Sequence, residues 1–344
     1  MTLPTATSHG LPGESVIRRR QGPATRRLRL AFVAGTLVLG VAGTAGIVQY
    51  ARTYWLYRGF SAPRNPATVV SRGGKRVERV KVGRGTQEVI YVRSAAIGNR
   101  SEAVYVYLPP GYFHHPKERY PVYYALHGSP GEAIDFDRVL DMGVAEDVLI
   151  AEHKIRPMII VSPTGAPSPF ADDEWANGVR RGQDWATYVS RDVVRAIDRR
   201  FRTIRKGSDR AIAGLSEGGY GALNIAIHNP GEFRVVESWS GYMLADKVTA
   251  VWGAHPSASL LAYNSPLLQV RHVARELRRD QSYFWFYCGS GDTLATQNVL
   301  FARALHKLAI PHKFQVRPGG HSWKLWRPMV NSALIVASEH FAGG

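Results

Sequence analysis

The residues best suited to chemistry form a short glycine-rich motif around a serine. Gly214-Leu-Ser216-Glu-Gly218-Gly219 lies between a strand-like run at 210–213 and a helix-like run at 218–228. A serine on such a sharp strand-to-helix turn has a strained backbone, so Gly214, Gly218 and Gly219 keep its surroundings small. The turn would raise the Ser216 hydroxyl above the edge of a sheet, where it could act as a nucleophile.

A serine hydroxyl is a weak nucleophile and needs a neighbouring base. Among the 12 histidines, His321 is the candidate because it lies in the loop 318–326, directly after the last strand-like run. A loop suits a base that must reach across a site. His228 and His306 fall in helix-like runs, and His340 lies near the end of an expected terminal helix, which favours structural roles for all three.

The acid that orients the base should follow a strand late in the chain. Asp292 ends the turn Gly289-Ser-Gly-Asp292 after the strand-like run 284–288, and is the preferred candidate. Asp246 is the alternative, because it also lies between Ser216 and His321 and follows the run 233–238.

Backbone N–H groups could stabilise a negatively charged oxygen near Ser216. The turn His127-Gly128-Ser129-Pro-Gly131 follows an apolar strand-like run, and the N–H of Ser129 is the expected donor. The N–H of Glu217, directly after the serine, is the expected second donor. A tight turn without a catalytic role is the alternative for this segment.

Other polar clusters give weaker signals. Asp135, Asp137 and Asp141 suggest a solvated helix start rather than a metal site, and 172–174 (Asp-Asp-Glu) suggests a polar loop rather than an acceptor site. No metal-binding cluster or phosphate-binding loop is evident, so we expect no cofactor. The single cysteine, Cys288, excludes an intrachain disulfide and falls in an apolar run typical of a buried strand.

The elements that must position these residues alternate between two patterns. Short apolar runs typical of strands fall at 87–92, 103–108, 120–126, 157–162, 210–213, 233–238, 284–288 and 313–316. Helical spacing occurs at 184–201, 218–228 and 296–308. Strands that alternate with helices predict an α/β domain at 86–344, with a mostly parallel sheet covered by helices on both faces.

The amino-terminal part has a different character. Residues 30–48 carry no charge, and their length nearly matches a bilayer core, so 30–50 is predicted to be a transmembrane anchor, with a cleaved signal segment as the alternative. Residues 1–29 would form a basic cytoplasmic tail and 51–85 a juxtamembrane linker, which places the main domain outside the cytoplasm.

The formal net charge of +17 is partly local to this region. Residues 1–60 hold eight arginines and one acid, Glu14. A basic segment beside an anionic bilayer explains this charge, whereas no nucleic-acid-binding motif is present. We therefore expect a membrane partner through the amino-terminal helix and no nucleic acid.

Several segments in this order resemble the putative-esterase family of α/β-hydrolases. They are 106–112 (Val-Tyr-Leu-Pro-Pro-Gly-Tyr), 120–128, 213–219, 233–241, 289–292 and 321–326 (His-Ser-Trp-Lys-Leu-Trp). The family includes esterase D, enterochelin and feruloyl esterases, and the antigen 85 mycolyltransferases. The resemblance implies an α/β-hydrolase fold, a triad of Ser216, Asp292 and His321, and chemistry on acyl esters.

The resemblance leaves several functions open. The His-Ser-Trp-x-x-Trp ending is similar to the mycolyltransferase branch, whereas the Gly-Leu-Ser-Glu-Gly-Gly form is nearer the plain esterases. An exported serine esterase acting on acyl esters, including those of lipids or glycolipids, is the first hypothesis. An acyltransferase, a serine peptidase, and a non-catalytic envelope protein on a hydrolase scaffold are the alternatives.

Overall fold

The computed structural model describes residues 66–73, 76–165, 173–245 and 248–342. They belong to a compact unit that begins at Tyr57. The predicted anchor at 30–50 and the alternative acid Asp246 lie outside these residues. None of the helices in the described ranges combines the length and apolar character needed to span a membrane.

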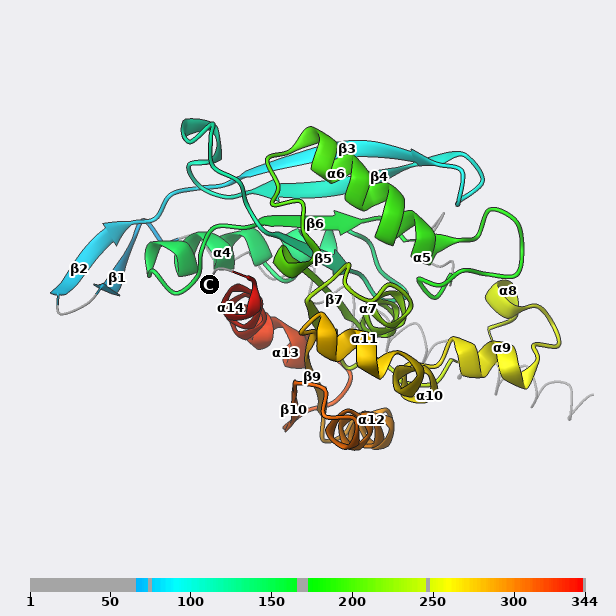
Figure 1. Cartoon of the computed structure of the whole chain (residues 1–344). Helices are drawn as coiled ribbons and strands as arrows, with labels where there is room; N and C mark the ends of the chain where they lie inside the picture. The colour runs from blue at the N-terminus through cyan, green and yellow to red at the C-terminus, as the bar shows by residue number, and fades with distance from the viewer. Residues whose placement is uncertain (1–65, 74–75, 166–172, 246–247, 343–344) are drawn as a thin grey trace, which may run out of the picture. The chain divides into compact units, whose positions relative to one another are not determined.

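Eight strands form the central sheet, in the order β10-β9-β8-β7-β5-β6-β4-β3 (Figure 1). They are β3 (Thr86–Ser94), β4 (Arg100–Leu108), β5 (Val122–Leu126), β6 (Ile159–Pro163), β7 (Arg210–Leu215), β8 (Val235–Trp239), β9 (Tyr283–Gly289) and β10 (His312–Arg317). The strands from β6 to β10 run parallel, while β4 and β3 are antiparallel. Each strand predicted from the sequence is present, with ends shifted by three residues or fewer.

Burial explains why these strands differ in sequence. Every residue of β5, β6, β7 and β8 is buried, so these strands are apolar along almost their whole length. In β3 and β4 buried and more exposed residues alternate over much of each strand, as expected near the edge of a sheet.

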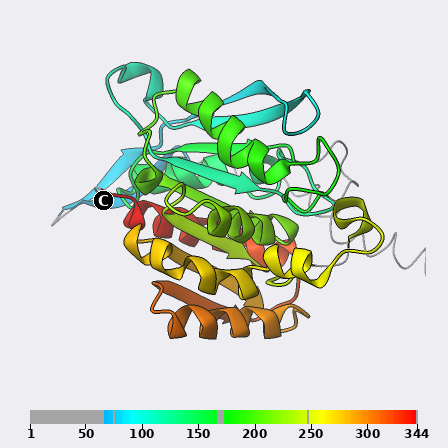
Figure 2. The same cartoon turned by 45° about the vertical axis from the view of Figure 1, so that its right-hand side comes forward.

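Helices cover both faces of the sheet. Figure 2 shows a row of helices across one face, made of α6 (Val194–Arg200), α7 (Glu217–His228), α11 (Ala274–Arg279) and α12 (Ala295–Lys307). On the other face α4 (Met142–Ala151) packs against α14 (Val330–His340). The predicted helix at 184–201 is present as α5 (Trp185–Thr187), a π-helical turn at 188–193, and α6.

The predicted linker region contains an element that the sequence analysis missed. Strands β1 (Thr68–Gly73) and β2 (Arg76–Lys81) pair as an antiparallel two-stranded sheet. The Gly73-Gly74 pair suggested a linker, but β-branched valines occur in both strands and favour extended backbone.

Candidate active site

Ser216 lies on a strained turn between β7 and α7. Its backbone has φ 55° and ψ −121°, outside the common regions for a residue with a side chain. The turn leaves no room around it: a Cβ atom on Gly214 would lie 2.2 Å from the Gly218 carbonyl oxygen, and one on Gly218 would lie 2.0 Å from that of Leu126. A Cβ on Gly219 would lie 2.8 Å from the hydroxyl oxygen of Ser238. Glycine at these positions is therefore a steric requirement of the turn.

The structure brings the three candidate side chains into one hydrogen-bonded chain. His321 Nε2 lies 2.8 Å from Ser216 Oγ, and His321 Nδ1 lies 2.9 Å from Asp292 Oδ2. The three residues are separated by up to 105 positions in sequence. The Asp292 side chain is fully buried, whereas 36% of the His321 side chain is exposed. The serine thus faces a base that is open to substrate and backed by a buried acid.

The environment of Asp292 keeps it ionised. Burial pushes the pKa of this carboxyl up, but hydrogen bonds from His321, from the Leu294 N–H and from the Ser240 hydroxyl outweigh it, so the net shift is downward. An ionised carboxylate only accepts hydrogen bonds, so His321 Nδ1 must carry the proton. Nε2 is then free to accept the proton of Ser216.

Ser240 and Trp326 extend this chain, and the sequence analysis had assigned neither of them a role. Trp326 Nε1 donates to Ser240 Oγ at 3.2 Å, and the Ser240 hydroxyl hydrogen-bonds Asp292. The Trp326 ring also packs edge-on against His321, with ring centroids 5.0 Å apart. Ser240 has a positive φ of 55° and directly follows β8. A polar residue directly after a strand was the only sequence feature that could have marked it as part of the site.

Two glycine loops bring the acid and the base together. The Gly291 N–H donates to the Gly319 carbonyl at 2.8 Å, and a Cβ on Gly289 would lie 2.4 Å from that same oxygen. Because β9 and β10 are parallel neighbours, the loops after them meet at one edge of the sheet. Asp292 and His321 follow these strands, so the topology explains their proximity.

The turn at 127–131 lies against the serine. A Cβ on Gly128 would come within 3.1 Å of Ser216 Cβ. Ser129 is partly exposed beside it, and Glu217 is the first residue of α7, where backbone N–H groups point out of the helix. Both expected N–H donors therefore lie on segments adjoining the serine.

The buried side chain of His127 makes two hydrogen bonds that fix this turn. Its Nε2 accepts from the Gly165 N–H at 3.0 Å, so its Nδ1 carries the proton that is donated to the Gly128 carbonyl at 2.9 Å. Burial lowers the pKa of His127, which keeps the ring neutral in this role. The bond holds the Gly128–Ser129 peptide in one orientation, and so aims the Ser129 N–H.

Two acidic clusters differ from the sequence prediction. In the described part of 172–174, Asp173 and Glu174 do lie in a loop, but both are buried, and Glu174 accepts a hydrogen bond from Tyr242. Asp135 does begin a helix, α3 (Asp135–Arg138), but it is buried rather than solvated. Sequence spacing could not reveal that tertiary partners cover these carboxylates.

Asp141, at the end of the second cluster, is also buried, and it pairs with Arg327. Within the described residues, no group of three metal-ligating side chains is close enough to hold a metal ion. Cys288 is buried in β9, as its apolar surroundings predicted.

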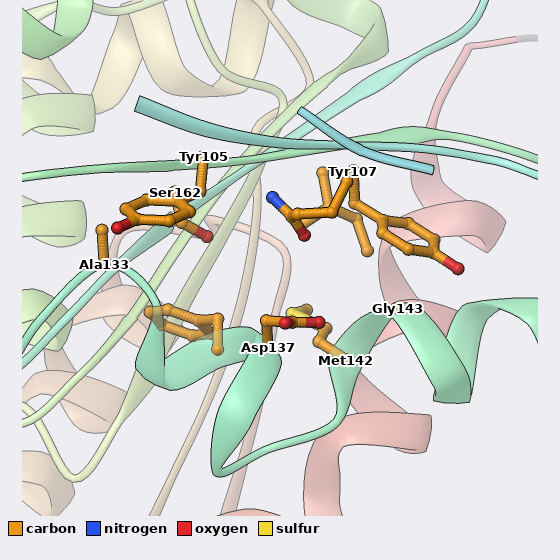
Figure 3. Close-up of a pocket in the computed structure, with 10 residues that line it drawn as sticks. Tyr105, Tyr107, Ala133, Asp137, Met142, Gly143 and Ser162 are labelled. Carbon is orange, nitrogen blue, oxygen red and sulfur yellow. The ribbon is translucent and has the colours of Figure 1, made fainter. Parts of the chain in front are cut away.

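A small cavity lies between strands of the sheet and the segment 133–143, which follows the 127–131 turn (Figure 3). Aromatic rings of Tyr105 and Tyr107 and the side chains of Asp137 and Met142 line it. Its volume is about 10 Å³, which is about what one water molecule occupies. The cavity is therefore too small to hold an acyl group.

Comparison with known proteins identifies the family. A profile of the family described as "Putative esterase" matches residues 94–337. The chain belongs to the putative esterase family. The chain also has the α/β-hydrolase fold. A solved structure of a ferulic acid esterase superposes on it with a TM-score of 0.66 at 26% sequence identity. The match covers 76% of this chain and 100% of that one.

Curated relatives include both esterases and acyltransferases. Esterase Rv1288 of Mycobacterium tuberculosis is 29% identical over 231 residues, covering 60% of this chain and 49% of that protein. Diacylglycerol acyltransferase/mycolyltransferase Ag85B of Mycobacterium leprae is 25% identical over 154 residues, covering 38% and 45%. The chain thus spans about half the length of these relatives.

Proposed function

We propose that this protein is a serine esterase that acts on acyl esters through an acyl-enzyme intermediate. The observation that carries the proposal is the hydrogen-bonded chain from Ser216 through His321 to Asp292, on a turn that only glycine neighbours allow. Membership of the putative esterase family supports the same chemistry.

The first half of the reaction follows from the protonation states. His321 Nε2 takes the proton of Ser216 while Oγ attacks the ester carbonyl. The carbonyl oxygen becomes negative and accepts hydrogen bonds from the N–H groups of Ser129 and Glu217. Asp292 stabilises the imidazolium that forms, and His321 then gives the proton to the leaving alcohol.

The second half decides between hydrolysis and transfer. The acyl group on Ser216 is released either to water or to an alcohol acceptor, and His321 removes the proton from whichever attacks. The similarity to the Ag85B acyltransferase favours acyl transfer as the second candidate function. Water and acceptor compete for the same intermediate, so both functions use one site.

The test uses the full-length protein beside its Ser216→Ala variant, on p-nitrophenyl esters of rising acyl length with and without a sugar acceptor. A fluorophosphonate probe should label the wild type and not the variant. Ser101→Ala, which removes an exposed serine of β4, is the matched control and should behave as wild type. Turnover or labelling that survives Ser216→Ala would exclude this mechanism, and products acylated on the sugar would assign transfer.

We also propose that residues 30–50 anchor the protein in the membrane with the catalytic domain exported. The uncharged run at 30–48 and the arginines before it support this. Fractionation of cells that express the full chain, followed by protease treatment of intact cells or spheroplasts, tests it. A protein found in the soluble fraction at full length would contradict the anchor.

A further inference from the structure

Two consecutive strained residues, Glu174 and Trp175, lie outside the triad. Both have positive φ, of 57° and 49°. They form part of a turn outside the helices and strands. A positive φ is unfavourable for a residue with a Cβ, and it persists where the surrounding contacts hold it in place. Such strain gathers at functional sites, so the contacts of these two side chains indicate what the turn does.

The indole of Trp175 contacts the 127–131 turn in two ways. Its Nε1 donates to the His127 carbonyl at 2.9 Å, and its ring packs edge-on against the His127 imidazole, with ring centroids 4.9 Å apart. Trp175 is 0% exposed, so water does not compete for these contacts. Trp175 therefore holds both the main chain and the side chain of His127, whose imidazole in turn fixes the Gly128 carbonyl.

The indole also packs against α7, the helix that follows the nucleophile. A Cβ on Gly221, in α7, would lie 2.4 Å from Trp175 Cβ and 2.8 Å from Cγ of the indole. A Cβ on Gly165, whose N–H donates to His127, would lie 2.2 Å from the indole ring. The His127 carbonyl itself approaches the first turn of α7, since a Cβ on Gly218 would lie 2.5 Å from it. The 127–131 turn, the indole and α7 thus contact one another.

Contacts on both sides fix the segment that carries the indole. The Tyr242 hydroxyl donates to Glu174, and the Tyr242 ring stacks on Tyr220 of α7, with ring centroids 4.5 Å apart. The Asn177 side chain donates to Thr187 Oγ1 at 2.9 Å and accepts from the Thr187 N–H at 3.0 Å. The segment is therefore attached to parts of the fold other than the 127–131 turn, so its indole can support that turn.

We propose that Trp175 is a positioning residue for the oxyanion hole. By holding His127 through the indole N–H and ring, it keeps the Ser129 N–H in one place relative to Ser216. The inference rests on the proposed esterase function and adds a residue that acts through another. A donor stabilises the tetrahedral intermediate only when it lies about 2.7–3.1 Å from the oxyanion. A small displacement of the turn therefore weakens binding of the transition state and leaves binding of the ester unchanged.

Trp175→Phe tests the proposal, because it keeps a buried ring but removes the indole N–H. Loss of a whole oxyanion donor lowers kcat by about 10²–10³, so we expect a misplaced donor to lower kcat on a p-nitrophenyl ester by about tenfold or more. KM should change by less than about twofold. A trifluoromethyl ketone, which forms a tetrahedral adduct with Ser216, should lose affinity by a factor similar to the loss in kcat.

Trp185→Phe is the matched control. Trp185 is also 0% exposed, but its Nε1 has no hydrogen-bond partner among the described residues, and its ring contacts Tyr188 and Arg100. The same substitution there should leave kcat and the affinity for the ketone close to the wild-type values, even where it lowers the melting temperature. Equal losses of kcat and of ketone affinity in the two variants would overturn a specific role for Trp175.

A second substitution keeps the test open if Trp175→Phe does not fold. Replacement of Trp175 by 3-benzothienylalanine keeps the two-ring shape but exchanges the N–H for sulfur, and should lower kcat by about three- to tenfold. Unchanged kcat and ketone affinity in a folded Trp175 variant would overturn this inference and leave the proposed function intact. A wild-type protein without ester turnover or fluorophosphonate labelling would overturn the proposed function, and this inference with it.

Discussion

The pKa values of two buried carboxyl groups near the same sheet, Asp292 and Glu237, are shifted in opposite directions. Asp292 follows β9 and has a lowered pKa, whereas burial raises the pKa of Glu237, in the middle of β8, to about 8. Both side chains are shielded from solvent, and desolvation pushes both pKa values upward. Burial alone therefore does not decide whether a carboxyl in this protein is charged.

The number and kind of hydrogen-bond donors explain the difference. Asp292 lies in a loop, so it receives a backbone N–H from Leu294 as well as side-chain bonds from His321 and Ser240. Glu237 lies in a strand whose backbone pairs with the strands on both sides.

Only side chains can therefore reach Glu237. Tyr123 donates to it at 2.7 Å and Trp239 at 3.2 Å. These two bonds do not offset desolvation. A strand end can thus hold a charged acid where the middle of a buried strand holds a neutral one.

The largest expected effect comes from replacing Asp292, the ionised carboxyl of the pair. Asp292→Asn keeps the shape but presents an amide that can donate, so His321 is no longer held with its proton on Nδ1. We expect kcat/KM on a p-nitrophenyl ester to fall by ~10³–10⁴. Steady-state kinetics measure this, with thermal unfolding as the folding control. A loss below tenfold would show that Asp292 is not the acid.

A second change tests the Glu237 side through stability. Below pH 4.5 both folded and unfolded states hold the proton, but between 4.5 and about 8 only the folded state holds it. The wild-type free energy of unfolding should therefore fall as pH rises across this window, by up to ~1.4 kcal/mol per pH unit, and level off above it.

Glu237→Gln cannot titrate and should lose this slope. We expect its free energy of unfolding to gain about 2–4 kcal/mol relative to wild type between pH 5 and pH 8, measured by urea unfolding. Glu118→Gln is the matched control, because Glu118 also accepts from a tyrosine hydroxyl but is exposed. An equal slope in wild type and Glu237→Gln would contradict the neutral state of Glu237.

Ser240→Ala tests the role of the hydrogen-bond donors, because it removes one of the groups that donate to Asp292. A hydrogen bond to a charged group contributes roughly 1.5–3 kcal/mol, so kcat/KM should fall by about tenfold or somewhat more. Because Ser240 helps lower the pKa of Asp292, the loss should be greater at the acidic end of a pH profile. Ser238→Ala, which removes a buried hydroxyl without a partner, should change the profile little. Identical profiles for the two variants would exclude a positioning role for Ser240.

The smallest effect concerns the donor to Ser240. Trp326→Phe keeps a ring against His321 but removes the Nε1–H that bonds Ser240. We expect a loss of about two- to fivefold in kcat/KM, and a larger loss for Trp326→Leu, which also removes the ring. Similar kinetics for both variants would show that the ring packing contributes nothing.

The sequence by itself identified what is encoded locally or by order along the chain. The elbow around Ser216 could be predicted because its steric needs fall on immediate neighbours such as Gly214 and Gly218. Asp292 and His321 could be singled out because each directly follows a recognisable strand. The alternation of apolar runs with helical spacing was enough to predict the sheet and its helices.

Only the tertiary structure decided which polar residues share one environment. Ser240 reaches Trp326 across 86 positions, and Tyr123 reaches Glu237 across 114, so no local pattern marks these partners. The burial of Asp135 depends in the same way on long-range packing. Local backbone preferences act over a few residues, whereas desolvation and hydrogen bonding depend on everything that folding brings near, and these set the charge of each acid.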